Sequence, residues 1–185
     1  AGILPVLVGE ENDQRDKFLN QDKTYIFTVL FGVKTDTFDL LGLPKLDTDF
    51  MEVVQKVDQF AVNGKHFSLT KSKLTEVSEQ LKEISTMQYP PYSSKTVTLD
   101  GTKTPLWKVA RAGRLDEVTI PEKTIQIHDL SLQETKRLQK NYIIYYIINQ
   151  IEKVDGDFRQ DEIIDEWKEV FADIEEEANF PVAKF

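Results

Sequence analysis

The sequence predicts an α+β domain, because strand patterns and helix patterns both occur in it and occupy different stretches of the chain. Residues 23–31 alternate between two sets of side chains, as a β-strand requires. Apolar residues recur at helical spacing in residues 74–84, 144–154 and 163–174. With 185 residues and 40% hydrophobic content, the chain is long enough for one domain with a real core.

Composition excludes several classes of protein. The sequence has no cysteine, which excludes disulfides and thiolate metal sites and is compatible with a reducing compartment, so we expect a cytoplasmic protein. No apolar run reaches the length of a membrane span. No phosphate-binding glycine loop, Ser-His-Asp order or paired-carboxylate signature occurs, and His66 and His128 are too isolated to indicate a metal site.

The charge is unevenly distributed. A net charge of −9 argues against an RNA-binding protein, because phosphate contacts require Lys and Arg. Residues 71–114, however, hold eight basic and four acidic side chains, whereas residues 150–185 hold four basic and twelve acidic ones. A nucleic-acid surface is therefore compatible with the first of these stretches.

The first expected elements are the strand at residues 23–31, which Gly32 ends, and a polar turn after it. The segment Thr35-Asp36-Thr37-Phe38-Asp39-Leu40-Leu41-Gly42 predicts a tight loop, because Asp and Thr side chains can accept backbone N–H groups. We expect Gly42 to supply a positive φ. The apolar spacing in residues 47–63 fits either a helix or short strands.

Three more elements are expected in the middle of the chain. Thr70 is the expected N-cap of a helix that contains the apolar stripe of residues 74–84. A two-turn helix should follow Thr104-Pro105, with Thr104 as its N-cap, and end before Gly113. Residues 124–128 should form a strand.

Residues 131–179 predict a helical hairpin. Residues 131–134 are spaced like a capping box at the start of a long helix, which Gly156 closes. Asp157 is the expected N-cap of a second amphipathic helix, which we expect to pack on the helix of residues 74–84. The β-rich composition of residues 142–148 leaves a strand open as the alternative.

Three segments of the chain, in order, carry a resemblance to a known family. They are Ala1-Gly2-Ile3-Leu4-Pro5-Val6-Leu7-Val8-Gly9, residues 22–42, and Gln88-Tyr89-Pro90-Pro91-Tyr92-Ser93-Ser94-Lys95 with Ala110-Arg111 and Gly113 after it. They resemble signatures of the TruB family of tRNA pseudouridine synthases. One residue fewer separates the prolines from Tyr92 than in the family pattern.

The resemblance implies a pseudouridine synthase catalytic core over residues 1–185, with a mixed, mainly antiparallel sheet and flanking helices. Residues 131–179 would be an insertion within it. The family's catalytic aspartate would lie upstream of Ala1, and its third signature would continue a strand that begins at Phe180. We therefore expect a core truncated at both ends, which is inactive alone, from an enzyme that isomerises the T-loop uridine at position 55 of tRNA without a cofactor or metal.

Tyr25 is the candidate catalytic residue. By the resemblance, its ring stacks on the flipped base and its hydroxyl can assist proton removal. The alternative is that Tyr25 alternates into the core with Phe27 and Val29. The resemblance implies a set of RNA-binding residues: Lys23, Asp36, Thr37, Asp39, Tyr92, Lys95 and Arg111. For Asp36, Thr37 and Asp39 the alternative is a plain solvated turn. For Tyr92, Lys95 and Arg111 it is a proline-rich turn and a solvated helix face.

The expected partner is the T arm of tRNA, bound by a monomer. Two alternatives stay open within RNA biology: a non-catalytic RNA-binding or tRNA-folding module, and a guide-dependent rRNA pseudouridine synthase. A third alternative, from another class, is an acidic interaction domain that presents the second hairpin helix to a protein.

Overall fold

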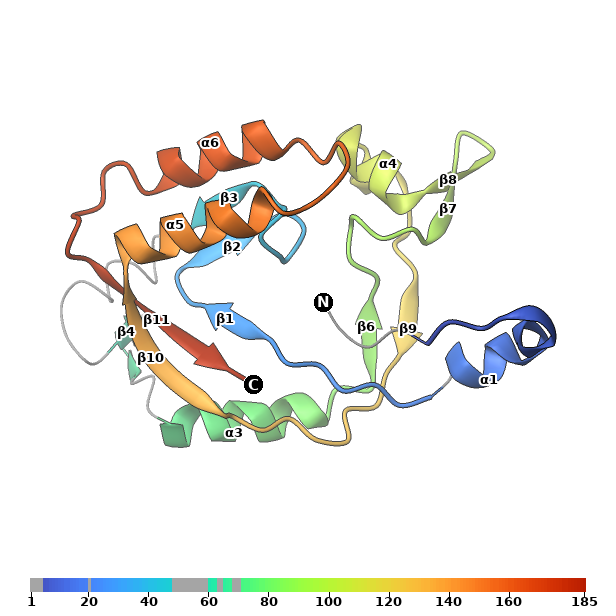
Figure 1. Ribbon diagram of the computed structural model, residues 1–185, viewed down its shortest axis with the longest axis horizontal. Coiled ribbons are helices and arrows are strands. Elements are labelled where there is room, and N and C mark those ends of the chain that lie inside the picture. Colours follow the sequence, from blue (N-terminus) through green and yellow to red (C-terminus); the bar gives the residue numbers. More distant parts are fainter. Residues whose placement is uncertain (1–4, 20, 48–59, 63–64, 68–70) are drawn as a thin grey trace.

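The computed structural model describes residues 5–19, 21–47, 60–62, 65–67 and 71–185 (Figure 1). Helices and strands are mixed along the chain, as the sequence predicts. The strands are β1 Thr28–Leu30, β2 Val33–Thr35, β3 Pro44–Leu46, β4 Phe60–Val62, β5 Lys65–Phe67, β6 Thr86–Gln88, β7 Thr96–Leu99, β8 Thr102–Pro105, β9 Glu122–Thr124, β10 Glu134–Gln139 and β11 Asn179–Lys184. The helices are α1 Arg15–Leu19, α3 Lys71–Lys82, α4 Leu106–Arg111, α5 Lys140–Ile151 and α6 Gln160–Val170, with 3₁₀ helices η1 Gly9–Gln14 and η2 Leu115–Glu117.

The central element is a three-stranded antiparallel sheet in the order β1-β11-β10. Leu30 lies opposite Val182, and backbone hydrogen bonds between Phe27 and Phe185 (3.2 and 3.0 Å) extend the pairing beyond β1. β11 is buried from Phe180 to Ala183, because it has a strand on each side and helices over one face. The strand expected from Phe180 onward is therefore confirmed. The other strands form four separate antiparallel pairs: β2-β3, β4-β5, β6-β9 and β7-β8.

The main core lies between helices α5 and α6, strand β11 and the loop between β2 and β3. Figure 1 shows α5 and α6 side by side next to β2 and β3. Phe171 stacks on Trp167, with ring centroids 6.1 Å apart, and meets Phe180 edge-on at 5.1 Å. The buried members of this cluster are Ile143, Ile147, Ile151, Ile163, Trp167, Phe171, Ile174 and Phe180. A smaller core joins β7 to α4 through Val97, Leu106 and Val109.

The hairpin expected at residues 131–179 is present, but it begins later and packs elsewhere. Residues 134–139, where a helix was predicted, form β10, because all six residues pair with β11 and this pairing outweighs the local capping signal. Residues 142–148 are helical, so the strand alternative is wrong. Helix α6 has Arg159, not Asp157, at its N-cap position. Its buried face meets β11 and the β2–β3 loop, and no described α3 side chain belongs to that cluster.

Other element boundaries also differ from the prediction. The strand of residues 23–31 narrows to β1, since residues 21–27 are exposed and pair only at Phe27. Thr104 pairs with Val97 in β8, so it is a strand residue and does not cap α4, whereas Gly113 follows that helix with φ 67° as predicted. The strand expected at residues 124–128 is wrong except at Thr124, because β9 spans Glu122–Thr124 and residues 125–128 are not in a strand.

Helix α3 confirms the helix predicted from the stripe of residues 74–84. Leu74 is buried, but Val77, Leu81 and Ile84 are 38–40% exposed. The predicted Thr70 cap lies outside the described residues, as does most of the ambiguous stretch of residues 47–63. None of the helices in the described part of the chain has the length and hydropathy needed to cross a membrane.

Replacing Ile163 by Ala should destabilise the protein by about 2–5 kcal/mol, because the Ile163 side chain is fully buried in the main core and its loss leaves a cavity. Ile26→Ala is the matched control, since that side chain is 67% exposed. Urea unfolding followed by circular dichroism measures both. Equal losses for the two variants would contradict the placement of the core.

Candidate functional site

The loop of residues 35–43 is held by its own side chains, as the sequence predicts. Asp39 Oδ1 accepts hydrogen bonds from the Leu41 N–H (2.9 Å) and from the Thr37 hydroxyl (2.7 Å). The Thr35 hydroxyl donates to the Asp39 carbonyl at 2.9 Å. Because these bonds satisfy backbone groups inside the turn, the loop keeps one shape while it projects polar side chains.

Gly42 is required here for a different reason from the one predicted. It is buried and does not have a positive φ; that conformation falls on exposed Phe38, at 65°. A Cβ on Gly42 would lie 2.6 Å from Asp36 Oδ1 and even closer to the Thr37 hydroxyl. The absent side chain therefore makes room for the carboxylate and hydroxyl that hold the loop.

Asp36 joins the two ends of this loop to each other and to the distant segment that contains Tyr92. Its Oδ1 accepts a hydrogen bond from the Leu43 N–H at 2.8 Å, and its carboxylate interacts with the Tyr92 hydroxyl. Burial of Tyr92, followed by the polar interaction with Asp36 and the negative charge of Asp36, raises the pKa of the phenol. The guanidinium of Arg159 lies 6.0 Å from the centre of the Tyr92 ring and opposes the rise.

A second cluster places two lysines on one aromatic ring. Lys95 Nζ lies 5.1 Å and Lys123 Nζ 5.4 Å from the centre of the Tyr89 ring. The β6–β9 pairing continues in a hydrogen bond from the Tyr89 N–H to the Pro121 carbonyl (3.0 Å), and this brings Lys123 beside the proline-rich segment. We call these three side chains, Tyr89, Lys95 and Lys123, the lysine platform.

Tyr25 stands apart from these clusters. It is 71% exposed, and its side chain makes no hydrogen bond or ring contact with another described residue. The alternative in which Tyr25 alternates into the core is therefore wrong. Phe27 stacks on Phe185 at 5.4 Å, at the rim of the sheet.

The remaining predicted residues also lie apart. Lys23 Nζ donates to the carbonyls of Leu19 and Gln21, at 2.8 and 2.9 Å, so Lys23 closes the turn after α1. Arg111 is exposed in the last turn of α4, and it forms no ion pair with the described residues. The structure therefore brings Asp36 and Tyr92 into contact and leaves Tyr25, Lys23 and Arg111 outside that contact.

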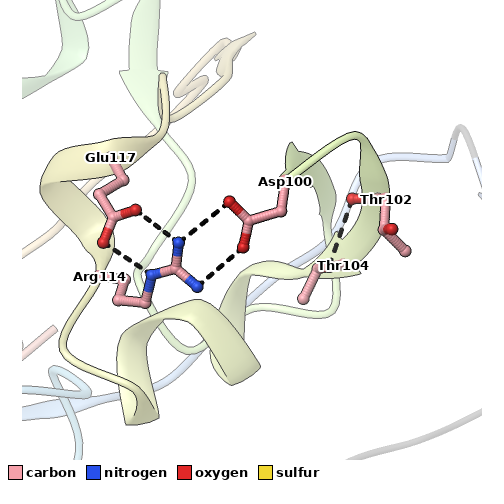
Figure 2. Close-up of polar contacts among 5 residues, drawn as sticks. All are labelled: Asp100, Thr102, Thr104, Arg114 and Glu117. Atoms are coloured by element: carbon pink, nitrogen blue, oxygen red, sulfur yellow. Dashed lines mark hydrogen bonds and ion pairs between the residues drawn. The ribbon is translucent and has the colours of Figure 1, made fainter.

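Arg114 is engaged by two carboxylates, as Figure 2 shows. Its guanidinium donates to Glu117 Oε1 and Oε2, at 2.7 and 2.6 Å, and to Asp100 Oδ2 and Oδ1, at 3.0 and 3.2 Å. These bonds raise the pKa of Arg114 and lower that of Glu117. The clamp ties the β7–β8 turn to η2, and its two carboxylates offset the charge that Arg114 would offer to phosphate.

The described residues contain no group of three His, Asp or Glu side chains that could hold a metal ion. His128 Nε2 instead lies 3.3 Å from Asp22 Oδ1, which links the segment before β1 to the segment after β9.

Sequence reasoning missed three functional candidates: Tyr89, Lys123 and Arg159. Tyr89 lies inside the proline-rich segment of residues 88–95, so its position in that segment could have indicated a role. Lys123 and Arg159 carry no local pattern, because their partners are distant in sequence and only the folded chain brings them together.

The fold and these clusters define an α+β protein that exposes aromatic and basic side chains. The family model described as the N-terminal domain of TruB family pseudouridylate synthases matches residues 1–147. The chain belongs to the TruB family. Residues 148–185, which contain the end of α5 and all of α6 and β11, lie beyond the matched range.

Individual relatives agree with this assignment. A protein named tRNA pseudouridine synthase B from Clostridioides difficile is 26% identical over 147 residues, which is 80% of this chain and 41% of the relative. Proteins of the same name from Caldanaerobacter subterraneus and Rickettsia bellii are 35% and 29% identical, over 71% and 70% of this chain and 39% and 36% of their own lengths. The chain thus spans about two fifths of the length of these curated relatives. No solved structure shows a significant match.

The Arg114 clamp should make stability depend on pH. Because the folded state lowers the pKa of Glu117, the stabilisation is present above the ordinary carboxyl pKa near 4.5 and is lost as pH falls through the lower, folded-state value. Arg114→Met should remove the part of the stability that depends on the ionised Glu117 carboxylate. In urea unfolding at a series of pH values, the difference in unfolding free energy between wild type and Arg114→Met should shrink in acid.

Arg111→Met is the control for the clamp experiment. This substitution removes the same charge, but Arg111 forms no ion pair with a described residue. A difference that stays constant from neutral to acid pH for Arg114→Met would show that the Glu117 contact does not form in solution.

Proposed function

We propose that the protein carrying this chain is a tRNA pseudouridine synthase that isomerises the T-loop uridine, position 55 of tRNA, and needs no cofactor. Membership of the TruB family and the names of the relatives support this assignment. The observation that carries it is the exposure of Tyr25. This residue lies just before strand β1 of the central sheet, and its large aromatic side chain does not pack in the core.

The same proposal covers the fold. The sheet β1-β11-β10 with its helices is, in this proposal, part of a pseudouridine synthase catalytic domain that spans residues 1–185. The stretch of residues 131–179 is an insertion within it, whose helical part is α5 and α6. Since these helices supply most of the main core, the insertion is structurally joined to the domain.

Tyr25 has two properties that the reaction requires. Formation of pseudouridine breaks the bond from uracil N1 to the ribose, turns the base, and forms a bond from C5 to the ribose. C5 then loses a proton, and N1 takes one up. An exposed ring can stack on an extruded base, and such stacking contributes about 1–3 kcal/mol per base in single-strand binders. The phenol hydroxyl, which has no described partner, is free to take part in the proton transfer.

RNA contact is assigned to the lysine platform and to the loop of residues 35–43. Two ammonium groups beside a flat ring suit a phosphate chain with an adjacent base. Asp36 and Asp39 each use Oδ1 to hold the loop, and Thr37 donates to Asp39. These three residues therefore determine the shape of the surface that RNA contacts. Lys23 and exposed Arg111 add positive charge at the edge.

The proposed ligand is the T arm of tRNA, bound by a monomer in the cytoplasm. A compact stem-loop fits this surface better than an extended guide complex does, because the exposed acidic face of α6 would repel phosphate beyond the loop.

In the whole protein that carries this chain, Tyr25→Phe should lower kcat by about two orders of magnitude or more, because the general acid–base contribution of the hydroxyl is lost. Its affinity for tRNA should stay close to that of the wild type, since the ring is kept. Tyr25→Leu should also weaken binding, because it removes the stacking surface. Tritium release from labelled tRNA measures turnover, and filter binding measures affinity.

Tyr145→Phe is the control for the Tyr25 experiment, because Tyr145 is similarly exposed, at 68%, but lies on α5. Near-normal turnover of Tyr25→Phe would remove Tyr25 from the chemistry. Binding of T-arm RNA by the wild type without any turnover would favour the non-catalytic RNA-binding module.

A further inference from the structure

Arg159 has an uncommon backbone conformation and a specific contact. It is the N-cap residue of α6 with φ 64° and ψ 34°, in the left-handed region, which is unfavourable for a residue with a Cβ. Its guanidinium lies over the ring of Tyr92, 67 positions earlier in the chain, at 6.0 Å from the ring centre. The surrounding structure must offset the backbone cost.

The turn before α6 is built to hold Arg159 in this conformation. Gln160 Oε1 accepts a hydrogen bond from the Phe158 N–H at 2.9 Å, and Gln160 Nε2 donates to the carbonyls of Val154 (3.0 Å) and Gly156 (2.6 Å). Asp157 Oδ1 accepts the Arg159 N–H at 3.4 Å. The backbone on both sides of Arg159 is therefore fixed.

A continuous line of contacts runs from Arg159 to the loop of residues 35–43. Arg159 covers the Tyr92 ring, the Tyr92 hydroxyl interacts with the carboxylate of Asp36, and Asp36 Oδ1 accepts a hydrogen bond from the Leu43 N–H. Helix α6 holds the same loop at a second point, where Trp167 Nε1 donates to the Leu40 carbonyl at 3.2 Å.

We propose that Arg159 is a positioning residue for RNA recognition: by stacking on Tyr92 it orients the Tyr92–Asp36 pair, and through that pair the loop that meets RNA. This inference rests on the proposed function. Arg159 lies beyond the residues that the family model matches, so the acidic hairpin contributes to the RNA site through one cation. Its action is indirect, and Arg159 itself does not contact phosphate.

Arg159→Met should weaken the affinity of the whole protein for a T-arm RNA hairpin by about two- to tenfold, the size of a partly buried cation–π contact, and leave kcat nearly unchanged. Arg159→Gly should have the same effect on RNA while it preserves or raises stability, because glycine adopts a positive φ without strain. Lys153→Met removes the same charge from the same hairpin turn and should leave RNA affinity unchanged.

Two further measurements separate positioning from direct contact. In an Asp36→Asn background, Arg159→Met should have little further effect on RNA affinity, because the pair through which it acts is already broken. The tyrosine absorbance titration of Arg159→Met should show the pKa of Tyr92 displaced upward, with Tyr92→Phe as the reference that identifies the signal.

The outcomes are distinct. Wild-type RNA affinity in both Arg159 variants, with normal binding by the wild type, overturns this inference alone. A full effect of Arg159→Met in the Asp36→Asn background, with a salt dependence reduced by about one phosphate contact, overturns positioning in favour of direct contact. Failure of the wild type to bind or modify T-arm RNA overturns the proposed function, and the role of Arg159 in RNA recognition with it.

Discussion

The packing of helix α6 on the loop of residues 35–43 is the contact on which the other parts of the described structure depend. Trp167 and Phe171 are buried against this loop and strand β11, and Trp167 Nε1 bonds the Leu40 carbonyl. Leu40, Leu41 and Leu43 pack on the same cluster. The face of the loop that carries these leucines is thus part of the hydrophobic core, and its carboxylates and hydroxyls hold the other face. A change in the core therefore changes the shape of the candidate RNA surface.

Segregation of charge makes RNA binding compatible with a net charge of −9. The lysine platform and Arg111 come from the β6–β9 pair, the proline-rich segment and α4. The acidic side chains of α6 are exposed on the side opposite its buried face, as Asp161, Glu162, Asp165, Glu166 and Glu169 are. Since screening confines such charges to about 10 Å, a phosphate chain near the platform is influenced mainly by the lysines. Arg114 contributes less positive charge to the surface, because Asp100 and Glu117 hold its guanidinium.

The parts that the sequence predicted correctly are those that depend on near neighbours. The loop of residues 35–43 is one, because Asp39 bonds groups two positions away and Asp36 bonds one seven positions away. The helical spacing in residues 74–84 and 163–174 was likewise sufficient. β10 was missed because Glu134 pairs with Lys184, and distant pairing overrode a local capping pattern. Arg159 was missed because its partner, Tyr92, is remote in sequence. The function of Gly42 was misassigned, since a close side-chain approach leaves no trace in the sequence.

Hydrogen exchange of the whole protein, measured by mass spectrometry with and without a T-arm RNA hairpin, tests most directly whether RNA lies on this surface. Bound RNA should slow exchange in residues 22–43 and 88–95, and in residues 154–160 through the contact of Arg159 with Tyr92. The exchange of the backbone amides in α6 beyond residue 160 should not change, because the exposed acidic face of this helix does not bind RNA. Protection confined to α6, or no protection in residues 22–43 under saturating RNA, would contradict the assignment of the RNA site.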